Sequence, residues 1–221
     1  MKCNTIIFDL DGTLLNTLED LMDSVNYALS QYGMPERKLE EIRHFVGNGV
    51  ERLMELSVPD GKNNPVFQDA FACFKEHYLI HCNDKTGPYP HIMELLEALS
   101  DKGYNMAIVS NKYMNAVKEL NELYFSKFIK VAIGESAGIR KKPAPDTVEE
   151  AIRQLGVSKD SCVYVGDSEV DHMTAVNSGL RCISCLWGFR TKEELIKAGA
   201  GNNIFVTDPM QILEVIQEEE L

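Results

Sequence analysis

Close to its start the chain reads Thr5-Ile6-Ile7-Phe8-Asp9-Leu10-Asp11-Gly12-Thr13. The first four residues are apolar or β-branched, which is typical of a short buried strand. Two aspartates and a glycine follow at once, so we expect the strand to end in a polar turn. A spacing of two puts Asp9 and Asp11 on one side of an extended segment, where two carboxylates repel each other unless a cation is present. The end of this strand is therefore the first candidate for a functional site.

Beyond this segment the hydrophobic pattern of the chain indicates a helical region and then a region of alternating helices and strands. Residues 16–82 carry apolar side chains at helical spacing, with an interruption at Gly47-Asn48-Gly49 and no strand pattern. From residue 92 onward, helices alternate with short apolar runs that read as strands. These strands are predicted at Met106–Val109, Ile129–Ile133, Cys162–Val165 and Arg181–Leu186.

The alternation predicts an α/β fold, because strands that alternate with helices form a parallel sheet covered on both faces. We expect a doubly wound, Rossmann-like core made of residues 1–15 and 84–221, with an inserted helical cap at residues 16–83. A last helix is expected to end in the acidic run Glu218-Glu219-Glu220. Ligands of such sheets bind at the carboxyl ends of the strands, so the polar residues there need the closest attention.

The composition argues against several classes of protein. The 221 residues include 22 Lys and Arg and 34 Asp and Glu, which gives a formal charge of −12. So acidic a chain is a poor candidate for nonspecific binding to nucleic acid or to an anionic membrane. The first residues do not form a signal peptide, and no window reaches the ~18 apolar residues of a membrane span. We therefore expect a soluble cytoplasmic protein.

The six cysteines indicate reduced, buried thiols, because they are scattered and several lie in apolar runs. Cys182 and Cys185 form a lone CxxC in a predicted strand, where side chains three apart point to opposite faces. No second pair of Cys or His completes a zinc set. We expect no metal or redox role for them.

Four predicted strand ends carry polar groups that suit one chemistry. Carboxylates in a small cluster suit Mg²⁺, which keeps several waters and takes a phosphate oxygen. A lysine, a serine hydroxyl and loop N–H groups suit a phosphate dianion. One carboxylate can attack phosphorus while a second shuttles the proton. The segments concerned are Asp9-Leu10-Asp11-Gly12-Thr13, Ser110-Asn111-Lys112, Lys142-Pro143 and Gly166-Asp167-Ser168-Glu169-Val170-Asp171.

These four motifs, in this order, resemble those of the haloacid dehalogenase superfamily, and the insert resembles its C1-type cap. The resemblance covers essentially the whole chain. Phe45-Val46-Gly47-Asn48-Gly49, Ser110-Asn111-Lys112, Lys142-Pro143-Ala144-Pro145-Asp146 and Trp187-Gly188 are most similar to the phosphoglycolate phosphatase branch. The resemblance implies a Mg²⁺-dependent phosphatase of a small phosphorylated metabolite, with 2-phosphoglycolate the best single candidate.

The resemblance assigns the chemical steps to the first motif. Asp9 matches the nucleophile that forms an aspartyl-phosphate. Asp11 matches the general acid and base, and its backbone carbonyl matches a ligand of Mg²⁺. Dehalogenating relatives lack an aspartate at the second position, because no alcohol leaving group needs a proton. Asp11 therefore favours phosphoryl transfer.

The later motifs supply the remaining roles implied by the resemblance. Ser110 and Asn111 match residues at the phosphate, and Lys142 matches the lysine that neutralises the phosphate and the nucleophile. Asp167 matches a direct metal ligand, and Asp171 a carboxylate that supports the metal site.

The insert leaves the choice of substrate open. Gly47-Asn48-Gly49 is either a plain turn or a set of N–H groups that binds a substrate carboxylate when the cap closes. Hinges for that closure are expected near Leu15-Asn16 and Asp84–Gly87. Arg43 lies either on a solvated helix face or against the substrate. Lys112, beside Ser110, is a further candidate for the anionic end of the substrate.

Other functions stay open on the sequence alone. A sugar-phosphate mutase, a nucleotidase or a pyrophosphatase of the same superfamily would carry the same four motifs. A phospho-aspartate signalling domain also uses an acidic cluster with Mg²⁺, but it is shorter and places its acceptor on a later strand. The intact motifs argue against a catalytically silent binding protein. The oligomeric state is not readable from the sequence.

Overall fold

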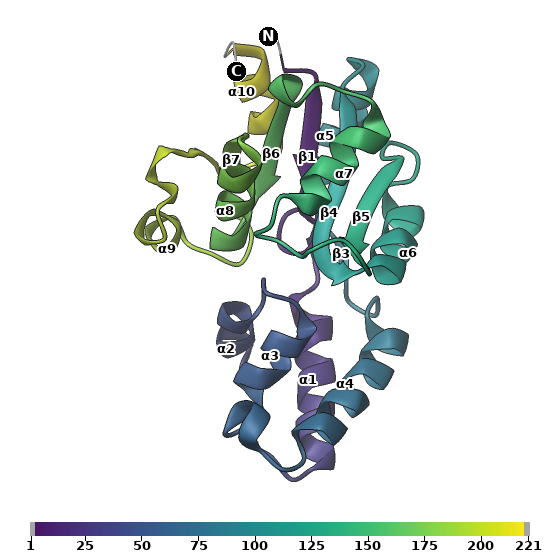
Figure 1. The fold of residues 1–221 in the computed structure, drawn as a ribbon, viewed down its shortest axis with the longest axis vertical. Helices are drawn as coiled ribbons and strands as arrows, with labels where there is room; N and C mark the ends of the chain where they lie inside the picture. The colour runs from purple at the N-terminus through teal and green to yellow at the C-terminus, as the bar shows by residue number, and fades with distance from the viewer. Residues whose placement is uncertain (1–2, 219–221) are drawn as a thin grey trace. The chain divides into compact units, whose positions relative to one another are not determined.

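The chain forms two compact units, an α/β unit made of residues 1–14 and 88–221 and a helical unit made of residues 15–87 (Figure 1). The computed structural model describes residues 3–218. The chain leaves the α/β unit after its first strand and returns at residue 88. The helical unit is therefore a single insertion into the α/β unit.

The α/β unit is built on a six-stranded parallel sheet in the order β5-β4-β1-β6-β7-β8. Phe8 of β1 lies opposite Ile108 of β4 and Val165 of β6, so these three strands run in level register. This sheet confirms the predicted α/β fold with a doubly wound parallel core. The strands are β1 (Thr5–Phe8), β4 (Asn105–Tyr113), β5 (Val131–Glu135), β6 (Cys162–Gly166), β7 (Arg181–Cys185) and β8 (Ile204–Val206).

Apolar side chains are buried on both faces of the sheet. Ile7, Ala107 and Tyr164 lie opposite one another on neighbouring strands. Together with Val148 and Ala175 of the helices they form one buried cluster. The residues on either side of them along β1 are just as buried, which is why the strand reads as a continuous apolar run. The helices of this unit are α5 (Ile92–Asp101), α6 (Met114–Tyr124), α7 (Asp146–Leu155), α8 (Glu169–Ser178), α9 (Lys192–Lys197) and α10 (Met210–Glu218).

The helical unit is organised around the packing of α1 against α4. Asp20 of α1 is 2% exposed and accepts hydrogen bonds from the backbone N–H groups of Lys85 and Thr86, at 2.9–3.1 Å. These hydrogen bonds hold the first turn of α1 against residues 85–86, where the chain returns to the α/β unit. The helices are α1 (Leu18–Gln31), α2 (Leu39–Phe45), α3 (Val50–Ser57) and α4 (Phe67–His81), and β2 (Leu15–Asn16) pairs with β3 (Gly87–Pro88).

Several predicted boundaries differ from the structure. The strand expected at residues 129–133 begins two residues later, because the chain first turns through backbone hydrogen bonds to Phe125. The second core strand runs on to Tyr113, so Ser110-Asn111-Lys112 lies within β4. The three-residue strand β8 was not predicted. Glu218 ends α10, while Glu219 and Glu220 lie outside the described residues. Within residues 3–218, no helix combines the length and the apolar character that a membrane crossing needs.

Candidate active site

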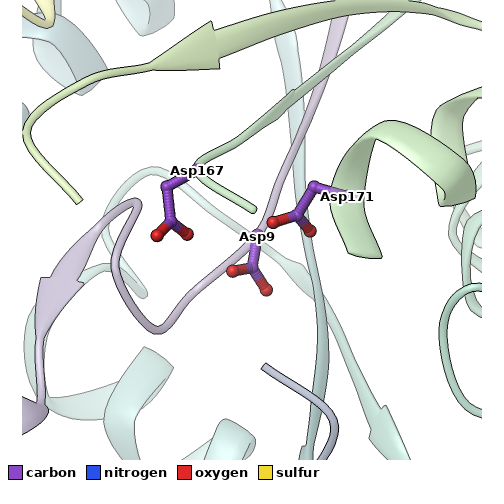
Figure 2. Close-up of side chains that lie close together, drawn as sticks. All are labelled: Asp9, Asp167 and Asp171. Carbon is purple, nitrogen blue, oxygen red and sulfur yellow. The ribbon is translucent and has the colours of Figure 1, made fainter. Parts of the chain in front are cut away.

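Three buried aspartates meet at the carboxyl edge of the sheet (Figure 2). Asp9 follows β1, Asp167 follows β6, and Asp171 lies in the first turn of α8. One carboxylate oxygen from each lies within 4.8 Å of the others. Since β1 and β6 are parallel neighbours in level register, the topology itself brings these strand ends together.

A buried lysine forms ion pairs with two of these three aspartates. The Lys142 Nζ lies 2.6 Å from Asp9 Oδ1 and 2.8 Å from Asp171 Oδ1, and the lysine side chain is only 3% exposed. The Tyr164 hydroxyl lies 3.2 Å from the same Nζ and donates to Asp171 Oδ1 at 2.9 Å. Sequence reasoning missed Tyr164. Its only signal was a hydroxyl-bearing side chain in an otherwise apolar strand, two residues before Gly166.

Asn111 holds the backbone of Lys142 on both sides. Its Oδ1 accepts from the Lys142 backbone N–H at 2.7 Å, and its Nδ2 donates to the Lys142 carbonyl at 3.1 Å. Ser110, which is buried beside it, accepts through Oγ from the backbone N–H of Lys112 at 3.1 Å. Asn111 can therefore act at this site by fixing the lysine-bearing segment.

The carboxylate of Asp11 does not join the three-aspartate cluster. It pairs instead with Lys112, whose Nζ lies 3.0 Å from Oδ1 and 3.2 Å from Oδ2. The Lys112 side chain is 4% exposed and that of Asp11 is 23% exposed. The two aspartates of the first motif thus have separate cationic partners.

Asp167 is held by groups from two loops. Its Oδ2 accepts from the backbone N–H of Phe189 at 2.7 Å, and its Oδ1 accepts from the Thr13 hydroxyl at 3.3 Å. Gly12 has a φ of +91°, and a Cβ there would lie 2.5 Å from the Asp167 carboxylate, so only glycine fits the turn. Trp187 donates to the Thr13 carbonyl at 3.0 Å and packs at the same turn.

Asp171 has no hydrogen-bonding capacity left in this arrangement. Its Oδ1 accepts from Lys142 and Tyr164. Its Oδ2 accepts from the Ser168 hydroxyl at 2.6 Å and from the Ser168 backbone N–H at 3.1 Å. A carboxylate with four donors is suited to supporting its neighbours rather than to binding a metal directly.

Burial and the neighbouring charges shift the pKa values of the three aspartates and of Lys142. Burial, together with the nearby Asp171, raises the pKa of Asp167 to about 7 and that of Asp9 well above its ordinary value. Burial would also raise the pKa of Asp171, but the Lys142 ammonium and the Ser168 hydroxyl lower it. Burial would lower the pKa of Lys142, but Asp171 and Asp9 raise it, so the lysine stays charged.

The charge balance of the site fits a divalent cation. The four aspartates just described carry four negative charges when ionised, and the two lysines offset two of them. The two negative charges that remain would be neutralised by one Mg²⁺. The oxygen atoms on offer are hard ligands of the kind that Mg²⁺ selects. Among residues 3–218, no other group of three or more His, Cys, Asp or Glu side chains is close enough to hold a metal.

The remaining candidates for contact with the substrate come from α2 and the turn that follows it. Arg43 is in the last turn of α2, and Gly47-Asn48-Gly49 links α2 to α3, so all of them belong to the helical unit.

The CxxC pair lies in β7, and burial raises the pKa of both Cys182 and Cys185, which keeps the thiols protonated.

A family model, curated relatives and a solved structure all match most of this chain. A family model described as Haloacid dehalogenase-like hydrolase matches residues 6–185. A phosphoglycolate phosphatase of Aquifex aeolicus (strain VF5) is 32% identical over 186 residues, which cover 83% of this chain and 85% of the relative. A phosphoglycolate phosphatase of Vibrio parahaemolyticus is 30% identical over 96% of this chain and 95% of its own length. The crystal structure of a Lactobacillus delbrueckii protein, proposed to be a phosphoglycolate phosphatase, has a TM-score of 0.92 at 38% identity and covers 98% of this chain and 99% of its own.

Proposed function

Because the chain belongs to the haloacid dehalogenase-like hydrolase family, we propose that it is a Mg²⁺-dependent phosphatase of a small phosphomonoester. The observation that carries the proposal is the buried cluster of three aspartates closed by Lys142. Such a cluster of carboxylates is costly to bury unless it binds a cation in its working state. The resemblance of the motifs supplies the roles of the individual residues.

Asp9 is the proposed nucleophile. One of its carboxylate oxygens bonds to phosphorus, the bond from phosphorus to the alcohol oxygen breaks, and Asp11 gives its proton to that oxygen. Water then attacks the aspartyl-phosphate and gives a proton to Asp11, which releases phosphate and restores the Asp9 carboxylate. Both transfers depend on positioning and on charge stabilisation rather than on further covalent chemistry.

The proposed metal site uses Asp9, Asp167 and the backbone carbonyl of Asp11. Mg²⁺ bound there would supply positive charge that offsets the repulsion between the anionic nucleophile and the phosphate. Asp171 would support this site through Lys142, since all of its oxygen lone pairs are engaged.

The proposed phosphate site uses the Ser110 hydroxyl and the Lys142 ammonium. Asn111 contributes by holding the backbone of Lys142. A lysine that already touches the nucleophile at 2.6 Å can follow the negative charge as it spreads onto the phosphate oxygens.

We propose 2-phosphoglycolate as the substrate, because curated relatives that cover most of this chain carry that activity in their names. The helical unit would act as a cap, and Gly47-Asn48-Gly49 and Arg43 would contact the part of the substrate beyond the phosphate. A mutase, a nucleotidase or a pyrophosphatase would share the chemistry and differ in this contact.

The substitution Asp9→Asn tests the proposed nucleophile. It keeps the shape of the side chain and removes the attacking oxygen anion, so we expect phosphate release to fall by at least about 10³-fold. Asp160→Asn makes the same chemical change at an exposed position and should leave turnover unchanged. Asp160 lies just before the start of β6, at the opposite end of this strand from Asp167. Full Mg²⁺-dependent turnover by the Asp9→Asn variant would refute the mechanism.

A further inference from the structure

Lys112 is a buried cation that pairs with the proposed general acid and not with the three-aspartate cluster. Its Nζ contacts both oxygens of Asp11, at 3.0 and 3.2 Å, from a side chain that is 4% exposed. Contact of the ammonium with both oxygens restrains where the carboxylate lies. An ammonium taken out of water is costly unless it is paired, so the contact constrains both side chains.

The backbone that carries Lys112 is itself held in place. The pairing of β4 with β5 shifts register between Val109 and Tyr113, and irregularities of this kind re-aim side chains at the end of a strand. The Lys112 backbone N–H bonds to the Ser110 hydroxyl at 3.1 Å. On the other side, Gly134 of β5 approaches so closely that a Cβ would lie 2.7 Å from the Lys112 carbonyl oxygen. The ammonium is therefore carried by a residue of a hydrogen-bonded strand rather than by a loop.

We propose that Lys112 is a positioning residue that holds the Asp11 carboxylate toward the leaving oxygen of the substrate. This inference rests on the proposed function. As Asp9 bonds to phosphorus and the bond to the alcohol oxygen breaks, the Asp11 proton moves to that oxygen. Lys112 neither gives nor receives a proton. It keeps the donor aligned, and small misalignments of such groups cost large factors in rate.

This role differs from the direct contact with substrate that the sequence suggested for Lys112. A lysine that binds the carboxylate of 2-phosphoglycolate would matter only for substrates that carry a carboxylate. A lysine that positions Asp11 matters for every substrate whose leaving oxygen needs a proton, whether or not a carboxylate is present.

The test compares leaving groups in the Lys112→Met variant. The value of kcat/KM reports on steps up to release of the alcohol, which is the step that Asp11 assists. With 2-phosphoglycolate and with an uncharged alkyl phosphate we expect kcat/KM to fall by about 10- to 100-fold. With p-nitrophenyl phosphate, whose leaving group departs as a stable anion, we expect a fall of less than about 3-fold. Lys127→Met, which breaks an exposed ion pair with Glu97, is the control for loss of a lysine.

A double-mutant cycle in alkyl phosphate turnover, where the leaving oxygen needs a proton, provides a second measurement. If Lys112 acts through Asp11, adding Lys112→Met to Asp11→Asn should change kcat/KM by less than about 2-fold. A loss confined to 2-phosphoglycolate, an equal loss on all three substrates, or full additivity in the cycle would overturn the proposal. Absence of Mg²⁺-dependent phosphate release by the unaltered protein would instead refute the proposed function, so the two failures are distinguishable.

Discussion

The stability of the metal-free protein should fall as the pH rises, because Asp167 is buried beside other carboxylates. Burial and the neighbouring Asp171 raise the pKa of Asp167 from an ordinary value of 3.8 to about 7. The folded protein therefore holds this proton more tightly than the unfolded chain does. Protonation of Asp167 stabilises the fold fully below about pH 4, and the contribution is lost as the pH rises through about 7.

The size of the effect follows from this difference in pKa. At 1.36 kcal/mol for each pH unit, the full contribution is about 4 kcal/mol, of which about 2 kcal/mol lies between pH 5.5 and 8.5. Urea unfolding of metal-free protein at these two pH values measures it directly. Saturating Mg²⁺ should restore more stability at pH 8.5 than at pH 5.5, because a cation that binds only the folded state replaces the lost proton.

The variant Asp167→Asn is the control, because an amide does not titrate. We expect the part of the pH-dependent loss that comes from Asp167, and most of the Mg²⁺-dependent gain, to disappear in it. Asp9, whose pKa burial also raises, keeps a further dependence on pH in this variant. The reasoning is refuted if the metal-free protein is as stable at pH 8.5 as at pH 5.5, or if the Asp167→Asn variant keeps the same dependence on pH.

Three substitutions test other contacts of the site. Tyr164→Phe removes a hydroxyl bonded to two charged groups and should cost about 1.5–3 kcal/mol of unfolding free energy in urea titrations, while Mg²⁺-dependent turnover persists at a reduced kcat. Lys142→Met leaves buried carboxylates without their cation, so turnover should be lost and unfolding should cost about 3–5 kcal/mol less; unchanged stability would contradict the assigned ion pairs. Gly12→Ala brings a Cβ to 2.5 Å from Asp167 and should weaken Mg²⁺-dependent activity as well as stability. Gly138→Ala, with a similar φ of +85° and open space around it, should show the backbone strain alone.

The sequence predicted best those features that depend on strand order. Asp9, Asp167 and Asp171 could be grouped from their positions in the chain, because parallel strand ends meet at one edge of a sheet. The strand of Ile204-Phe205-Val206 escaped prediction, because three residues at the edge of a sheet show no clear period.

The contacts of individual side chains could not be predicted in the same way. A lysine can reach several neighbours, so the pairing of Lys112 with Asp11 depends on the irregular end of β4 and on the close approach of Gly134. Tyr164 was hidden because its ring satisfies the apolar pattern of the strand, while its hydroxyl serves Lys142 and Asp171. Sequence patterns report which face a residue occupies, but not where the tip of a long side chain lies.

The most direct test of the proposed function is phosphate release from a panel of substrates, measured with Mg²⁺ and with a chelator. The panel should contain 2-phosphoglycolate, sugar phosphates, nucleotides and pyrophosphate. The proposed function predicts release that requires Mg²⁺ and that favours 2-phosphoglycolate. Release that the chelator leaves unchanged, or no release from any member of the panel, would contradict it.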